Sequence, residues 1–162
     1  MKRKGFSLLE LTVTIAAFTV FTAVSAYLFR AMLLSWSSEE KNADLRIALG
    51  RAVFAITYDI RSSREVSSPA GSDELRFRQG TSDYWVYYFY NGSSGTALYK
   101  AGLSGGINGT YTPGEGTPVL TDVLPPPASD LSVEDDLVRL YLRAARSAEE
   151  AGVRARILPR NL

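Results

Sequence analysis

The sequence contains no cysteine and no histidine among its 162 residues. Without cysteine there is no disulfide framework, no thiolate metal site and no thiol catalysis. Without histidine the chain lacks the commonest general base and the commonest transition-metal ligand. The formal net charge is only +1, so no global charge draws the chain to a polyanion. We therefore predict a protein that is not an enzyme, with no catalytic residue, no metal site and no cofactor.

Two further absences mark the N-terminal part of the chain. Residues 11–29, about 19 positions, carry no charge, which is the length a helix needs to cross a bilayer. Residues 6–49 contain no proline and no glycine, so nothing breaks a helix there. A secretory signal peptide has a shorter apolar region that ends at a small-residue cleavage site, whereas this run ends at Arg30 without one. A single-pass signal anchor explains the run and the basic residues that precede it, but it does not explain Glu10.

Glu10 is the informative residue of this segment. A carboxylate in an apolar helix costs about 2.5–3.5 kcal/mol at the bilayer centre and less near an end. Such a residue is a functional-site candidate that requires a partner, and the apolar run offers none. The simpler alternative is that Glu10 lies near the cytoplasmic end of the helix and reaches the lipid headgroups.

The sequence around Glu10 resembles a known processing motif. Residues 4–11 read Lys-Gly-Phe-Ser-Leu-Leu-Glu-Leu and are similar to the motif of type IV prepilins and type II secretion pseudopilins. The resemblance covers about the first 30 residues and implies that a membrane aspartyl peptidase cuts between Gly5 and Phe6 and methylates the new amino terminus of Phe6. It further implies that Glu10 pairs with the Phe6 amine of a neighbouring subunit during assembly. A contact between the two groups within one chain stays open as an alternative.

The resemblance also implies a location and a set of partners. Lys2, Arg3 and Lys4 keep the N-terminus in the cytoplasm by the positive-inside rule, so the chain crosses the cytoplasmic (inner) membrane once and its C-terminal domain lies outside before filament assembly. The implied partners are the prepilin peptidase, other major and minor pilins, the inner-membrane assembly platform and membrane lipid. Nucleic acid is a partner only if the filament is a DNA-uptake pilus.

Beyond the apolar run the sequence predicts that the same helix continues as an amphipathic one. An i, i+3, i+4, i+7 stripe should pack on a sheet, and it comprises Leu45, Ala48, Leu49, Ala52, Val53, Ile56 and Ile60. We expect a single helix from Phe6 to about Arg61. A second flank carries Ile47, Phe54 and Tyr58, for which the simpler expectation is a wider core face and the alternative is contact with the next subunit.

After residue 62 the period changes from helical to strand-like. Strands are predicted at 74–79, 84–90, 96–100, 117–124, 136–143 and 153–158, with a hairpin turn at 91–95 and a glycine-rich loop at 101–116. The fold class is α+β: a pilin fold in which a long N-terminal helix, half transmembrane and half amphipathic, packs on a C-terminal antiparallel sheet of about five to seven strands. The predicted parts are a leader at 1–5, a transmembrane half-helix at 6–30, an amphipathic half-helix at 31–62 and a β-rich globular domain at 63–162.

Three features of the C-terminal half are candidates for binding a ligand. The cluster Asp130, Glu134, Asp135 and Asp136 matches no calcium-binding loop, so we expect a solvated acidic turn. The tyrosines of residues 84–90 are expected to pack in the core or between subunits rather than to stack on bases or sugars, because basic residues do not alternate with them. The glycine-rich loop lacks the Gly-Lys-Ser/Thr ending of a phosphate-binding loop.

The functional prediction is a minor pilin or pseudopilin, a subunit of a type IV pilus or a type II secretion filament. The residues at 58–61 and the Arg-x-Arg strand that contains Arg154 and Arg156 are similar to J-type pseudopilins and W-type minor pilins. The missing glycine and proline in the membrane half of the helix favour a minor subunit over the main structural pilin. The alternative is a monomeric, signal-anchored extracytoplasmic protein that binds a ligand.

Overall fold

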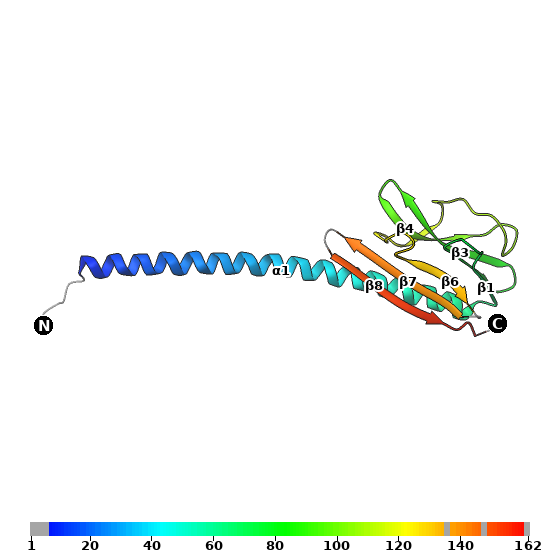
Figure 1. Ribbon diagram of the computed structural model, residues 1–162, viewed down its shortest axis with the longest axis horizontal. Coiled ribbons are helices and arrows are strands. Elements are labelled where there is room, and N and C mark those ends of the chain that lie inside the picture. The colour runs from blue at the N-terminus through cyan, green and yellow to red at the C-terminus, as the bar shows by residue number, and fades with distance from the viewer. Residues whose placement is uncertain (1–6, 135–136, 147–148, 161–162) are drawn as a thin grey trace. The chain divides into compact units, whose positions relative to one another are not determined.

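The computed structural model describes residues 7–134, 137–146 and 149–160 (Figure 1). The chain divides into two compact units, Met1–Glu40 and Lys41–Leu162, which we call the N-terminal unit and the C-terminal unit. The predicted cleavage position at Gly5 and Phe6 lies outside the described residues, as does the basic cluster at 2–4. The predictions on those residues therefore stay predictions.

One helix, α1, runs from Leu8 to Ser62, as the lack of glycine and proline in its first part predicts. Its end is well defined, because the Ser62 hydroxyl donates to the Asp59 carbonyl and both the amide and the hydroxyl of Ser63 donate to the Ile60 carbonyl. These bonds satisfy carbonyl groups that have no partner within the helix.

In the C-terminal unit, one face of α1 is buried along the predicted stripe. Its fully buried members are Leu45, Leu49, Ala52, Ile56 and Ile60. The second flank behaves differently: Ile47, Phe54 and Tyr58 are 52%, 74% and 67% exposed. The expectation that this flank widens the core face is therefore wrong, because the buried stripe alone already supplies the helix face that packs in the core.

Five strands form an antiparallel sheet in the order β1-β2-β3-β4-β5. They are β1 (Glu65–Ser67), β2 (Glu74–Gln79), β3 (Asp83–Gly92), β4 (Gly95–Gly102) and β5 (Thr117–Leu120). The β2 prediction is confirmed, whereas the three-residue β1 was too short to predict. The hairpin turn is tighter than expected, because Gly92 pairs with Gly95 and only two serines lie between them. Gly95 has a φ of 108°, which glycine adopts without steric cost.

The remaining strands form a second antiparallel sheet in the order β6-β7-β8. They are β6 (Asp130–Glu134), β7 (Leu137–Arg146) and β8 (Glu149–Ile157). The expectation of one sheet of five to seven strands is wrong, since the described residues form eight strands in two sheets. The predicted strand at 117–124 is also too long: Asp122 takes a φ of 59°, and Val123 then pairs with Ala144 of the second sheet.

A single core joins α1 to both sheets within the C-terminal unit. Alternate residues of the strands point into it, among them Phe77 of β2, Tyr87 of β3 and Leu140 of β7. These three side chains are nearly or fully inaccessible to solvent. The prediction of a long amphipathic helix packed on antiparallel strands is confirmed in this coarse form.

The glycine-rich loop that follows β4 folds back over the outer face of the first sheet. The Tyr111 ring packs on the Tyr88 ring with centroids 4.4 Å apart, and the Arg76 guanidinium donates to the carbonyls of Ile107 and Gly109. A Cβ atom at Gly109 would collide with the backbone of Ser104, so the loop requires glycine there. For Tyr88 the predicted packing role is confirmed.

Candidate functional site

The N-terminal unit exposes apolar surface all around α1. No described residue of this unit is buried, and its large apolar side chains from Leu8 to Trp36 are mostly exposed. A soluble domain does not leave so large an apolar surface in water. This segment of α1 is long and apolar enough to span a membrane, which is compatible with the predicted single-pass anchor; its orientation is not fixed by the fold.

The threonine hydroxyls inside this apolar segment are satisfied within the helix itself. Thr14, Thr19 and Thr22 each donate to the carbonyl four residues earlier at 2.7–2.8 Å, and Thr12 donates to the carbonyl three residues earlier at 2.9 Å. A bilayer core offers no water to hydrogen-bond an unpaired hydroxyl. The segment can therefore enter lipid without an unsatisfied threonine.

Glu10 lies in the first turn of α1, and its side chain is exposed. The Glu10 carboxylate forms no hydrogen bond or ion pair with any residue that the structure describes. The partially positive N-terminal end of a helix favours a carboxylate at this position, but no residue within the described ranges supplies a full counter-charge. Its predicted partner, the amine of Phe6, lies outside the described ranges.

The exposed flank of α1 forms a ridge in the C-terminal unit. Phe54 and Tyr58 are one turn apart, and a hollow lies on each side of them. The first hollow has a volume of about 590 Å³ and reaches Arg61 and Arg160; the second has a volume of about 450 Å³ and reaches Trp85 and other residues of the first sheet. Rows at i and i+4 form the ridges that pack into the grooves of another helix. This ridge with its flanking hollows is therefore suited to receive a second helix.

A buried polar cluster next to the ridge was missed by sequence reasoning. The Asp59 carboxylate accepts hydrogen bonds from the Tyr87 hydroxyl at 2.6 Å, from the Lys100 ammonium at 2.6 Å and from the Gln79 amide at 2.9 Å. The Lys100 ammonium also lies 4.8 Å from the centre of the Trp85 ring. Burial, and then the neighbouring Asp59 carboxylate, raise the pKa of the Tyr87 hydroxyl well above its usual range.

The arrangement around Asp59 joins the last turns of α1 to three strands of the first sheet. Every oxygen of the carboxylate has a donor, which makes the cluster a rigid link rather than a reactive group. A sequence signal was present: Asp59 directly precedes a buried stripe position at Ile60, and a charge so close to the core requires a partner.

The two described members of the acidic cluster lie in a strand and not in the predicted turn. Asp130 begins β6 and accepts a hydrogen bond from the Ser132 hydroxyl, while Glu134 ends the strand and pairs with Arg139. The apolar residues Leu131 and Val133 alternate with polar ones, as in a strand with one buried face. Burial of Leu131 in the core therefore favours a strand here in spite of the acidic residues. Asp135 and Asp136 lie outside the described residues. Within residues 7–134, 137–146 and 149–160, no group of three or more acidic side chains is placed to hold a metal ion.

Comparisons of the chain with protein-family models, with curated proteins and with solved structures find no match.

Proposed function

We propose that the chain is a subunit of a membrane-anchored filament of the type IV pilin-like class, in the role of a minor pilin or pseudopilin. The observation that carries this proposal is the construction of α1. A single helix has a membrane-length apolar segment with one carboxylate in its first turn, and its later turns form the core of a β-rich unit. A signal anchor needs the apolar segment, but it needs neither the carboxylate nor the helical continuity.

Glu10 supplies the assembly chemistry in this proposal. Cleavage after Gly5 creates a cationic amine at Phe6, which the peptidase then methylates. Because one helical turn separates the two residues, a neighbouring subunit displaced along the helix axis brings its amine to Glu10. In a low-dielectric environment an unpaired charge costs several kcal/mol, so the pair fixes the axial register of neighbouring helices.

The ridge at Phe54 and Tyr58 supports the same assignment. Lateral packing of helices in a filament would cover these two exposed aromatic rings and fill the hollows beside them. Partners in this proposal are the prepilin peptidase, other pilins, the assembly platform and lipid. The basic residues at 2–4 keep the N-terminus on the cytoplasmic side.

The experiment compares Glu10→Gln with Glu10→Asp in the full chain, expressed with the prepilin peptidase and assembly proteins of its source. Both variants should be cleaved and should enter the membrane. Glu10→Gln should be lost from sheared filaments, whereas Glu10→Asp keeps the charge and should retain part of the incorporation. Normal incorporation of Glu10→Gln would contradict the pairing mechanism.

A second candidate is a monomeric, signal-anchored protein that binds a ligand outside the cytoplasm. A cavity on the outer face of the second sheet, described below, favours it. Mass spectrometry of the mature N-terminus separates the two candidates. A chain that begins at methylated Phe6 supports the filament subunit, and an intact leader supports the anchored monomer.

A further inference from the structure

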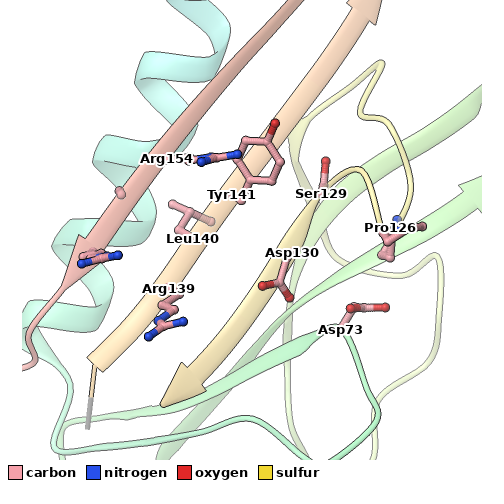
Figure 2. A pocket seen from close by; sticks show the side chains of 11 residues that line it. Asp73, Pro126, Ser129, Asp130, Arg139, Leu140, Tyr141 and Arg154 are labelled. Carbon is pink, nitrogen blue, oxygen red and sulfur yellow. The ribbon is translucent and has the colours of Figure 1, made fainter. Parts of the chain in front are cut away.

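The outer face of the β6-β7-β8 sheet carries a cavity with charges of both signs. It has a volume of about 540 Å³. Arg139 and Tyr141 of β7 pair directly with Arg156 and Arg154 of β8, so all four side chains lie on the same face. Figure 2 shows Arg154 beside the Tyr141 ring, with the carboxylates of Asp73 and Asp130 across the cavity.

The arginines of this face are incompletely neutralised. Arg139 pairs with Glu134 at 2.5 Å, and the Arg154 guanidinium lies 4.5 Å from the centre of the Tyr141 ring. Among the described residues, neither Arg154 nor Arg156 has a carboxylate partner. Like charges directly opposite each other destabilise a strand pair, and Arg139 faces Arg156 across β7 and β8. A carboxylate bound to Arg156 would relieve this repulsion.

A matching pair of opposite sign lies on α1. Glu40 and Asp44 are exposed, and within the part of the chain that the structure describes neither forms an ion pair. Like charges at i and i+4 destabilise a helix, so this pair also gains from counter-charges. Four helical residues rise about 6 Å, and two strand residues span about 6.6 Å. The carboxylates of Glu40 and Asp44 are thus spaced like the guanidinium groups of Arg154 and Arg156.

We propose that Arg154 and Arg156 of one copy of this chain bind Glu40 and Asp44 of a second copy. Arginine and carboxylate form two parallel hydrogen bonds, which adds directional specificity to the charge attraction. The contact rests on the membrane anchor of the proposed function, which brings two copies of the chain into one bilayer.

The charge pattern favours a protein segment over nucleic acid as the occupant. Asp73, Asp130 and Glu134 border the arginines, so a continuous phosphate backbone would run across carboxylates. The net charge of +1 supplies no compensating attraction at a distance. A protein segment that carries positive and negative charges within a few residues, as residues 40–44 do, matches the mixed charges of the cavity.

The first test uses the absence of cysteine from the chain. Two differently tagged full-length populations, Asp44→Cys and Arg156→Cys, are mixed in lipid vesicles and oxidised. A mixed disulfide dimer carrying both tags should be the main product. The matched control replaces Arg156→Cys by Ser94→Cys, which lies exposed in the β3–β4 turn and should give no mixed dimer. An equal yield from both mixtures would overturn the proposal.

The second test reverses the charges and does not depend on cysteine geometry. Arg154→Glu with Arg156→Glu should abolish co-purification of two differently tagged copies, and so should Glu40→Arg with Asp44→Arg. Mixing the two reversed variants should restore it. Arg51→Glu and Asp83→Arg, both on exposed positions outside the two patches, serve as controls that should leave co-purification unchanged.

Two other outcomes separate this contact from the proposed function. If reversal at Arg154 and Arg156 leaves self-association intact while Glu10→Gln still blocks filament incorporation, the contact is wrong and the filament subunit stands. If the wild-type chain binds a short DNA duplex and the same reversal abolishes that binding, the face is a nucleic-acid surface and the second-copy contact is overturned.

Discussion

The two units contain parts of the same helix, yet the same residue type is exposed in one unit and buried in the other. Leu28 in the N-terminal unit is 60% exposed, whereas Leu49 in the C-terminal unit is 2% exposed. Both are leucines in regular helical turns of α1. Helical structure is therefore common to the two units, and the difference lies in what covers the apolar side chains. In the C-terminal unit strands of the same chain cover them, whereas in the N-terminal unit lipid or another molecule has to do so.

Polar groups show the same contrast. In the N-terminal unit the threonine hydroxyls bond to carbonyls one turn away and need no tertiary contact. In the C-terminal unit the Asp59 carboxylate takes all its donors from strands that lie 20 to 41 positions away in the sequence. The first unit can thus be placed in lipid without rearrangement, while the second depends on the complete fold around it.

The largest expected effect comes from placing charge in the N-terminal unit. Ala17→Arg combined with Val20→Arg should cost about 5–7 kcal/mol of membrane insertion, from about 2.5–3.5 kcal/mol for each charge near the bilayer centre. The protein should leave the membrane pellet on carbonate extraction. Ser93→Arg with Ser94→Arg, at the exposed β3–β4 turn, should remain in the pellet. Retention of the first variant would contradict the membrane assignment.

Loss of the buried carboxylate should have the next largest effect, and it should be confined to the C-terminal unit. Asp59→Ala leaves Lys100 and Tyr87 without their partner, so the free energy of unfolding should fall by about 3–5 kcal/mol. Chemical denaturation monitored by tryptophan fluorescence measures this, since Trp85 lies beside Lys100. Asp59→Asn keeps an acceptor and should lose less. Equal losses in the two variants would show that the charge of Asp59, rather than its capacity to accept hydrogen bonds, carries the stability.

A matched pair of isoleucines on α1 sharpens the comparison between covered and uncovered helix faces. Ile56 is fully buried and Ile47 is 52% exposed. Ile56→Ala should lower the free energy of unfolding by about 2–5 kcal/mol, because it leaves a cavity in the core. Ile47→Ala should change it by no more than about 0.5 kcal/mol. Urea titrations of both variants provide the test, and similar losses would mean that the exposed flank is covered within the monomer.

The smallest effect is expected in the loop over the first sheet. Tyr111→Phe removes the hydroxyl that donates to Glu74 at 2.6 Å but keeps the ring packed against Tyr88, so about 1 kcal/mol of stability should be lost. Hydrogen exchange of the loop amides should accelerate, while that of β7 should stay unchanged. Faster exchange throughout the C-terminal unit would show that the loop supports the whole fold.

Sequence patterns predicted the elements that depend on neighbouring residues. The buried stripe of α1 and the strand Glu74–Gln79 follow from periods of 3.6 and 2, which a single segment displays by itself. Strand β6 was missed because its five residues carry three polar side chains and only two apolar ones, and the local charge suggested a turn. The Asp59 cluster was missed because its donors come from β2, β3 and β4.

The sequence alone determined that α1 is one unbroken helix with an apolar first part and a single carboxylate near its start, because these properties depend on residue type and spacing. Only the tertiary structure decided that the strands divide into two sheets, that the flank of Ile47, Phe54 and Tyr58 faces outward, and that Asp59 is buried with its partners. Such features arise from contacts between residues far apart in the chain, and no local period records which distant side chain will occupy the space beside a given one.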